Sequence, residues 1–268
     1  MGSYLSVVNK NVLLKAAVSD VAIQWTCFVV AQVFKTEKFY DLVGSSSFLY
    51  LTWATLIWSK RGHSVVWHPR QTIQNSCISV WAVRLGTYLF SRVIASGGDR
   101  RFRKAKENPL LFFTFWTMQA VWVWLTLLPT MILNTKEENK ELNYRDYIGW
   151  SVWALGFLVE VIADYEKSKF KSRPENNGKF ISVGLWSLCR HPNYLGEVLM
   201  WAGLFLPAAN VMQGKEFISI ISPFFVSYLL TKVSGIPMLE RYAEKKWSGN
   251  ADYQKYKAST AMMIPFVW

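Results

Sequence analysis

The sequence predicts an all-α, polytopic membrane protein with about seven transmembrane helices, within a range of six to eight. Apolar residues make up 51% of the 268 residues and aromatic residues 16%, with 14 Trp, so the chain has more large apolar surface than a soluble domain of this length needs. The apolar residues also gather in runs near the length of roughly 17 to 25 residues that crosses a bilayer as a helix.

The predicted spans follow one another with no internal repeat or low-complexity linker between them. They are Ala16–Phe34, Leu42–Trp58, Thr72–Ile94, Leu110–Leu133, Tyr147–Ala163, Leu195–Val211 and Phe217–Val233. We therefore expect one membrane-embedded domain over residues 1–268.

Lys and Arg are distributed unequally between alternate loops of this seven-span arrangement. One side receives nineteen of them and the other nine, and the richer side is expected to face the cytoplasm. An integral membrane protein of this kind would lie in the endoplasmic reticulum of a eukaryote or in the inner membrane of a bacterium. Contact with membrane lipids follows directly from such spans.

The formal net charge of +12 suits nucleic acid, anionic lipid or a phosphorylated cofactor. We expect no nucleic acid as a partner, because no basic, aromatic-interleaved soluble module occurs in the chain. The three Cys and three His are scattered, and none pairs at zinc-ligand spacing. The sequence therefore indicates neither a metal site nor a disulfide framework.

The third span carries three polar residues, Arg84, Tyr88 and Arg92, four positions apart and hence on one helix face. Charges inside a span mark a functional or cavity-lining face by default. Alternatively, Arg92 extends to the membrane interface and Arg84 forms a structural pair. The sequence leaves both interpretations open.

The end of the fifth span places Glu160, Asp164, Lys167 and Lys171 on one helix face, with the carboxylates deeper and the cations at the cytoplasmic end. Carboxylates accept hydrogen bonds from sugar hydroxyls, and cations pair with phosphate oxygens. The alternative is an ordinary basic cluster beside an anionic lipid surface.

Five polar residues within eight positions open the sixth span: Arg190, His191, Asn193, Tyr194 and Glu197. Unsatisfied polar groups are costly where a chain enters a membrane, so this cluster is expected to hold something polar. The positive end of the helix that starts there also favours an anion. Together with the preceding basic helix end, the cluster predicts a cytoplasm-facing pocket for a large, anionic cofactor.

These segments resemble the steroid 5-alpha-reductase-like membrane proteins, including their uncharacterised reductase-like branch. The resemblance covers about the last 110 residues and rests on Ala163-Asp164 with Lys167 and Phe170, Gly184-Leu185-Trp186, Arg190 to Glu197, Tyr253 to Lys257, Thr260 and Ile264-Pro265-Phe266. Weaker similarity extends through Tyr40-Asp41-Leu42, Trp81 to Arg92 and Gly98 to Phe102.

The resemblance implies an NADPH-dependent oxidoreductase that reduces a carbon–carbon double bond, usually conjugated to a carbonyl, in a lipophilic steroid-like or long-chain substrate. Residues 147–268 would be its cofactor-binding half. The implied cofactor-binding residues are Asp164, Lys167, Lys171, Trp186, Arg190, His191, Asn193, Tyr194 and Glu197. The sequence has no glycine-rich dinucleotide fingerprint, so helices rather than a βαβ turn would hold the nicotinamide.

The catalytic candidates are Tyr88 and Asp41, because related reductases use a tyrosine and an acid from their N-terminal half. The spacing from Tyr88 to Arg92 differs by one residue from the spacing expected in steroid reductases. Asp41 has the weaker match of the two.

Two alternatives belong to other classes. Membrane methyltransferases that use S-adenosylmethionine carry a similar Arg-His-Pro-x-Tyr-x-Gly segment, and a non-catalytic lipid-binding membrane protein could keep the same fold. The Asp164–Lys171 helix face and the Ile264-Pro265-Phe266 ending favour the reductase.

Overall fold

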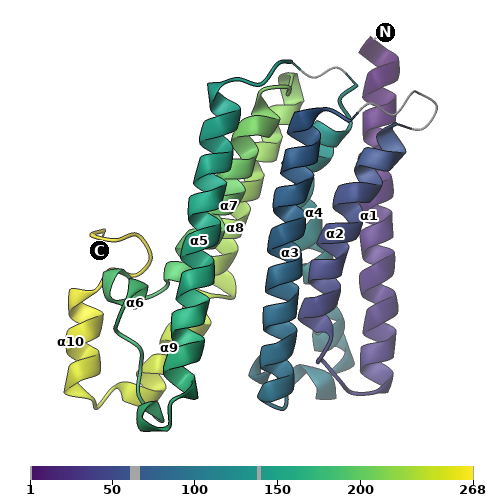
Figure 1. Cartoon of the computed structure of the whole chain (residues 1–268). Coiled ribbons are helices and arrows are strands. Elements are labelled where there is room, and N and C mark those ends of the chain that lie inside the picture. Colours follow the sequence, from purple (N-terminus) through teal and green to yellow (C-terminus); the bar gives the residue numbers. More distant parts are fainter. Residues whose placement is uncertain (1, 61–66, 138–139, 268) are drawn as a thin grey trace. The chain divides into compact units, whose positions relative to one another are not determined.

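The fold is all-helical across the residues that the computed structural model describes, 2–60, 67–137 and 140–267 (Figure 1). Its α-helices are α1 (Gly2–Val33), α2 (Tyr40–Ser59), α3 (Pro69–Ala95), α4 (Pro109–Asn134), α5 (Tyr144–Ser172), α6 (Leu185–Leu188), α7 (Pro192–Ala209), α8 (Ile221–Tyr228), α9 (Ile236–Trp247) and α10 (Ala251–Ser259). Shorter turns are η1 (Arg100–Phe102), η2 (Ala105–Glu107), η3 (Pro174–Asn176), η4 (Gly214–Ile220) and the π-helical η5 (Leu229–Val233). These residues contain no β-strand, which confirms the all-α prediction.

Five helical segments of the described chain are long and apolar enough to cross a membrane: Asn11–Val33, Pro69–Ala95, Pro109–Asn134, Tyr144–Ser172 and Gly214–Trp247. They support an integral membrane protein. The two further predicted spans correspond to α2 and α7, which are not among these five. Three consecutive serines lower the hydropathy of α2, and Asn193 and Glu197 lower that of α7. The count of about seven spans therefore stays a prediction.

The chain divides into two compact units. The first contains Met1–Asp146 and Pro207–Ser222, and the second contains Tyr147–Leu206 and Pro223–Trp268. The single domain inferred from the sequence stays an expectation.

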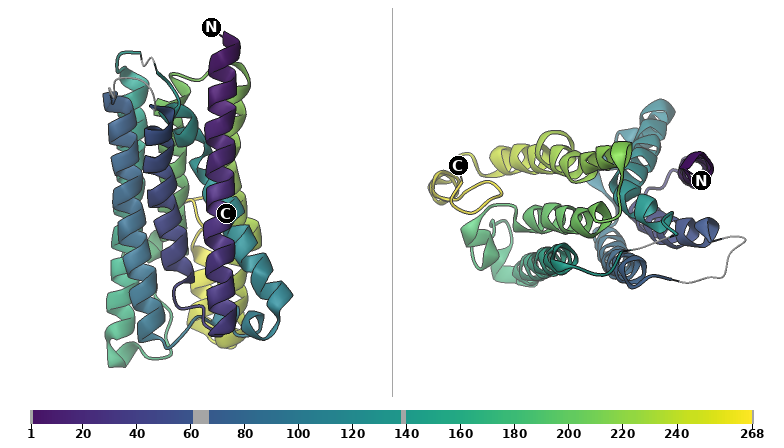
Figure 2. Two further views of the ribbon diagram at one scale, coloured as in Figure 1. Left: turned by 90° about the vertical axis from the view of Figure 1, so that its right-hand side faces the viewer. Right: turned by 90° about the horizontal axis from the view of Figure 1, so that it is seen from above.

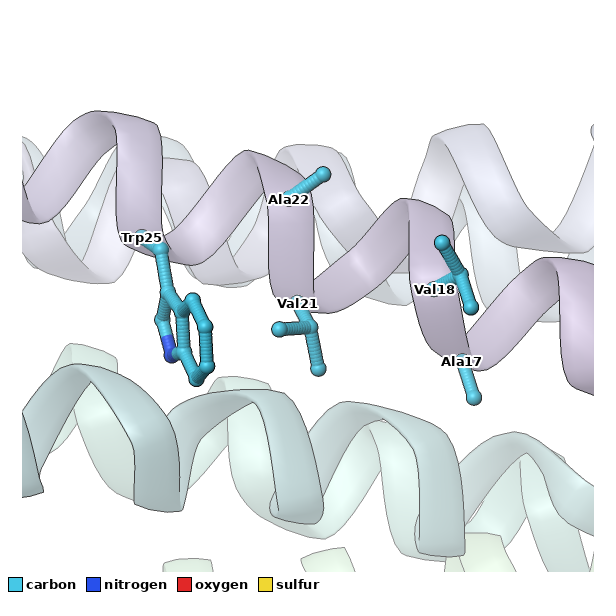
Figure 3. A pocket seen from close by; sticks show the side chains of 5 residues that line it. All are labelled: Ala17, Val18, Val21, Ala22 and Trp25. Carbon is cyan, nitrogen blue, oxygen red and sulfur yellow. The ribbon is translucent and has the colours of Figure 1, made fainter.

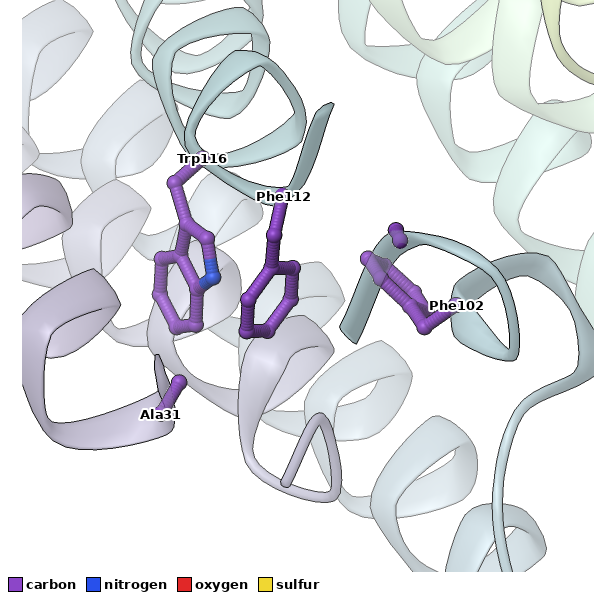
Figure 4. Packing of buried hydrophobic residues seen from close by; sticks show 5 residues of the cluster. Ala31, Phe102, Phe112 and Trp116 are labelled. Atoms are coloured by element: carbon purple, nitrogen blue, oxygen red, sulfur yellow. The ribbon is translucent and has the colours of Figure 1, made fainter. Parts of the chain in front are cut away.

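Successive helices from α1 to α4 run antiparallel to each other in the first unit (Figures 1 and 2). Helix α1 packs against both α2 and α4. An aromatic cluster ties the loop after α3 to this bundle. Phe102 of η1 lies 6.0 Å, between ring centroids, from Phe112 of α4, and Phe112 lies 6.1 Å from Trp116 (Figure 4). Because all three rings are buried, the cluster stabilises this loop through apolar burial.

A chain of buried polar side chains crosses the apolar interior of the first unit. Gln24 of α1 donates to Ser47 of α2 at 3.0 Å, and Gln119 of α4 donates to Gln24 at 2.9 Å and to the Tyr40 carbonyl at 3.0 Å. Asp20, one turn before Gln24, is fully buried. These hydrogen bonds join three helices where lipid offers no partners.

A buried ion pair closes the other end of the same unit. The Arg70 guanidinium contacts both Asp146 oxygens at 2.6 and 2.7 Å, and both side chains are at most 1% exposed. Arg70 also donates to the carbonyls of Lys140 and Glu141, while Asp146 accepts from the Asn143 amide. This pair therefore fixes the segment before α5 against the start of α3.

In the second unit, glycines let α5 and α7 approach closely. A Cβ at Gly196 would lie 2.5 Å from the Gly156 carbonyl oxygen and 2.8 Å from the Glu160 amide nitrogen. Further along, a Cβ at Gly203 would lie 2.6 Å from the Gly149 carbonyl oxygen. Small residues at such crossings are typical of packed membrane helices. The close approach brings the polar end of α5 beside the start of α7.

Candidate functional site

On the polar face of α5, the burial of the side chains decreases toward the end of the helix. Glu160 and Asp164 are buried, at 4% and 5% exposure, whereas Lys167 is half-buried and Lys171 is exposed. Burying carboxylates requires compensating contacts, so this face is suited to polar or charged partners. Its role in binding a cofactor stays a prediction.

Trp186 anchors the short helix α6 against α5. Its buried indole donates from Nε1 to the Ala163 carbonyl at 3.0 Å, and the Lys167 ammonium lies 4.3 Å from the ring centroid. The Tyr256 hydroxyl donates to the Trp186 carbonyl at 2.5 Å. Gly184 starts this turn with a φ of +62°, which glycine adopts readily. These contacts are structural, and contact between Trp186 and a cofactor stays a prediction.

One carboxylate, Glu240 of α9, bridges two of the predicted residues. Its Oε2 lies 2.7 Å from Arg190 Nη1, and its Oε1 lies 2.9 Å from His191 Nε2. Burial lowers the pKa of His191 below the ordinary value, although the Glu240 carboxylate opposes this shift. The imidazole is therefore neutral at pH 7 and is held at one edge.

The Tyr194 ring stacks on one face of the His191 imidazole. The two rings are stacked with centroids 5.7 Å apart and an interplanar angle of 12°. Gly235 leaves room for this arrangement, because a Cβ there would lie 2.9 Å from the Tyr194 ring and 2.8 Å from the Leu230 carbonyl oxygen. Leu230 belongs to the π-helical turn η5, a feature often found at functional sites.

Asn193 and Glu197 lie on the first turns of α7 but differ in their contacts. Glu197 is 8% exposed and accepts from Trp201 Nε1 at 2.8 Å. By contrast, the buried Asn193 Oδ1 has no hydrogen-bond partner among the described residues. Asn193 is therefore better placed than Glu197 to accept from a ligand without losing a contact of its own.

Three buried polar atoms near the start of α7 lack protein partners within the described chain: Arg190 Nε, His191 Nδ1 and Asn193 Oδ1. They come from residues within four positions. Leaving such atoms unpaired costs about 1–3 kcal/mol each, so a polar ligand at this point would gain hydrogen bonds that the described chain does not supply. No group of three or more His, Cys, Asp or Glu side chains that could hold a metal occurs in the described part of the chain.

The two catalytic candidates belong to the first unit, whereas all nine cofactor candidates belong to the second. The guanidinium carbons of Arg84 and Arg92 lie 5.3 and 5.9 Å from the Tyr88 ring centroid. Both Asp41 oxygens accept from Arg101 Nη2, at 2.9 and 3.0 Å. Asp41 thus has a structural ion-pair partner, and its proposed role as an acid stays a prediction.

An open groove on α1 lies apart from these residues along the chain. Its lining is entirely apolar: Ala17, Val18, Val21, Ala22 and Trp25 (Figure 3). It has no convergent polar groups of the kind that orient a substrate. This groove is therefore suited to lipid contact rather than chemistry.

A family model described as "Protein of unknown function (DUF1295)" matches residues 27–260 of the chain. The chain belongs to the DUF1295 family. Steroid 5-alpha-reductase-like proteins are among the members of DUF1295, so the expected resemblance is supported at this level, although membership of its uncharacterised branch is not established.

Two curated relatives match parts of this DUF1295 protein. The "Probable O-methyltransferase ustE" of Ustilaginoidea virens is 31% identical over 100 residues, which cover 37% of this chain and 33% of the relative. The 3-oxo-5-alpha-steroid 4-dehydrogenase 1 of Rattus norvegicus is 28% identical over 119 residues, or 44% of this chain and 40% of the relative. The matches thus span well under half of each relative. No solved structure gives a significant match.

Sequence reasoning missed Glu240, which contacts both Arg190 and His191. Glu240 lies about 50 positions after Arg190. Helical periodicity links only residues that are close in sequence, so it could not connect the two. The available signal was weak, because Glu240 is one of two carboxylates in a segment that also holds Arg241, Lys245 and Lys246.

Proposed function

We propose that this DUF1295 protein uses NADPH to reduce a carbon–carbon double bond, conjugated to a carbonyl, in a lipophilic steroid-like or long-chain substrate. Residues 147–268 would form the cofactor-binding half and face the cytoplasm. Family membership and the distant similarity to a steroid dehydrogenase support an enzymatic activity of this class.

The observation that carries the proposal is the charge around the polar cluster. Residues 166–190 include six Lys or Arg against two Glu. NADPH carries a pyrophosphate and a 2′-phosphate, whereas S-adenosylmethionine carries one carboxylate against an ammonium and a sulfonium. The excess of positive charge in residues 166–190 attracts the phosphates of NADPH and repels the ammonium and sulfonium of S-adenosylmethionine.

The unpaired atoms at the start of α7 fit the same cofactor. His191 Nδ1 and Asn193 Oδ1 can accept from its carboxamide or ribose hydroxyls, while Lys167, Lys171 and Arg190 can pair with its phosphates. Bound NADPH supplies a hydride. The residues of this chain would bind and orient the dinucleotide.

Reduction of an enone also requires a hydrogen-bond or proton donor at the carbonyl oxygen, where negative charge develops. Tyr88 is the candidate, because its hydroxyl can donate and two guanidinium groups flank its ring. Positive charge at this position would stabilise the developing oxyanion.

Replacing Tyr88 with phenylalanine should lower turnover of a 3-oxo-4-ene steroid or a long-chain enone by about 100-fold, the usual scale of a lost acid catalyst. NADPH affinity should not change. Steady-state oxidation of NADPH in detergent measures the first effect, and calorimetric titration measures the second. Tyr50→Phe, at an exposed tyrosine of α2, is the control. Wild-type turnover in Tyr88→Phe would remove Tyr88 from the chemistry.

Calorimetric titration of the purified full chain with NADPH and with S-adenosylmethionine tests the cofactor directly. We expect saturable NADPH binding that weakens with salt, because exposed cations contribute to it. Binding of S-adenosylmethionine without NADPH binding would contradict the proposal. Binding of neither would favour a non-catalytic, lipid-binding role.

Replacing Asn193 with alanine should weaken NADPH binding by about 1–3 kcal/mol, the cost of leaving a buried ligand group unpaired. The melting temperature without ligand should not fall, because Asn193 Oδ1 has no protein partner to lose among the described residues. Asn250→Ala is the matched control. Asn250 Oδ1 caps α10 through the Tyr253 amide at 3.0 Å, so that variant should lose stability and keep its affinity. An unchanged NADPH affinity in Asn193→Ala would argue against the site.

The second candidate function is methyl transfer from S-adenosylmethionine to an oxygen of a lipophilic acceptor. One observation favours it: the similarity to a probable O-methyltransferase, whose matched stretch covers about a third of each chain. The same unpaired acceptors could receive hydrogen bonds from an ammonium group. The paired titration separates this candidate from the reductase.

A further inference from the structure

Glu240 contacts two residues of the candidate site at once, through different carboxylate oxygens. Oε2 pairs with Arg190 Nη1 at 2.7 Å, and Oε1 faces His191 Nε2 at 2.9 Å. Only 22% of the Glu240 side chain is exposed, so these contacts are partly shielded from water. The pairing with Arg190 fixes the carboxylate in place beside the imidazole.

The chemistry of a carboxylate determines which imidazole nitrogen carries the proton. An ionised carboxylate only accepts hydrogen bonds, so the nitrogen that faces it must be the donor. A neutral imidazole with its proton on Nε2 has a bare lone pair on Nδ1. That Nδ1 is buried and has no partner in the described chain.

The ring orientation is constrained in the same way. Stacking against Tyr194 holds the imidazole plane, and a flip of the ring would take Nε2 away from Glu240. Nδ1 is therefore kept available for a ligand. A histidine with a purely structural role has no need to present an unpaired acceptor at 4% exposure.

We propose that Glu240 is a positioning residue that holds His191 with its proton on Nε2, so that Nδ1 accepts a hydrogen bond from an N–H or O–H group of the bound cofactor. This inference rests on the proposed function, in which the donor would be a carboxamide or ribose hydroxyl of NADPH. It makes the site selective for a ligand that presents a donor at this point.

The protonation of His191 can be measured without any ligand by nitrogen-15 NMR of histidine-labelled protein in detergent. The chain has three histidines, so His63→Gln and His68→Gln variants assign the remaining signals to His191. In the wild type we expect a proton-bearing Nε2 and a bare Nδ1 at pH 7. A proton on Nδ1 instead would overturn the inference, and this measurement needs no Glu240 variant to fold.

Variants of Glu240 then test whether the carboxylate causes this state. In Glu240→Ala the two nitrogen shifts should converge, because both tautomers become populated. In Glu240→Gln they should stay near the wild type, because the amide oxygen can still accept from Nε2. Glu244→Ala is the control, since Glu244 pairs with Lys257 at 2.6 Å instead of with His191. A wild-type spectrum in Glu240→Ala would contradict the role of Glu240.

The pH dependence of the same signals gives an independent readout. Glu240 favours the protonated imidazole, whereas burial, Lys167 and Arg190 disfavour it, and the net pKa lies below the ordinary 6.5. His191 should therefore protonate only below about pH 6.5 in the wild type. Removing the negative charge in Glu240→Ala or Glu240→Gln should move this midpoint to still lower pH. If the midpoint for protonation of His191 does not move in these variants, the direct contact between Glu240 and His191 is contradicted.

Ligand affinity completes the test. Glu240→Ala should bind NADPH about tenfold more weakly, as expected for one lost buried hydrogen bond, while Glu240→Gln should recover most of the affinity. Unchanged affinity in Glu240→Ala would overturn the inference. Binding of S-adenosylmethionine in place of NADPH would refute the proposed reduction only. A tenfold loss of S-adenosylmethionine binding in Glu240→Ala would still support the positioning role of Glu240.

Discussion

Replacing Arg70 with alanine is expected to lower the free energy of unfolding by about 3–5 kcal/mol, because the buried Asp146 carboxylate would lose its ionic partner. Arg70 donates hydrogen bonds to both Asp146 oxygens and to the carbonyls of Lys140 and Glu141. All of them are lost together in the variant. Thermal unfolding of the purified protein in one fixed detergent measures the effect as a large drop in melting temperature.

The double variant Arg70→Met with Asp146→Leu is the control for this prediction. It removes both charges, so no unpaired ion stays buried, and such replacements are often neutral or stabilising. It should therefore melt well above Arg70→Ala, although the carbonyls of residues 140 and 141 still lose their donors. A melting temperature for Arg70→Ala equal to that of the wild type would show that the pair contributes little.

Replacing Gly196 with leucine should abolish measurable NADPH binding and lower the stability of the second unit by about 3 kcal/mol, the upper end for overpacking. The added side chain would meet the Gly156 carbonyl and the Glu160 backbone, neither of which can turn aside as a flexible side chain could. The start of α7 would then move away from Asp164 on α5. Titration with NADPH and a melting curve measure the two effects.

Gly249 supplies the matched control in the same unit. A Cβ there would meet nothing within 4 Å, and its backbone does not require glycine. Gly249→Leu should therefore bind NADPH as the wild type does. If Gly196→Leu also kept its affinity, the close approach of α5 and α7 would not be needed for the site.

Apolar runs and helical periodicity predicted the long helices and the polar face of α5, but not the short helices α6, α9 and α10. Glu160, Asp164 and Lys167 lie on a helix as expected, and their burial decreases toward its end. The number of spans was harder to predict, because α2 and α7 are long enough to cross a membrane but contain polar residues. Whether such helices cross a bilayer depends on partners that length and composition do not reveal.

Contacts between distant segments explain most of what the sequence did not reveal about the site. The sequence grouped Arg190 and His191, but their shared carboxylate comes from Glu240, about 50 residues later. Asp41 likewise has a partner that the sequence did not indicate, because it pairs with Arg101, 60 residues away. Such partners depend on how helices pack, and no single segment encodes them.

The buried polar chain of the first unit also has a consequence for the order in which this protein assembles. Asp20 and Gln24 would face lipid if α1 entered the bilayer alone, which is costly for a carboxyl group and an amide. Gln119, which donates to Gln24, is synthesised 95 residues after it. We therefore expect the first helix to reach its stable position only after the fourth has emerged from the ribosome, so that α1 to α4 assemble as a group rather than one by one.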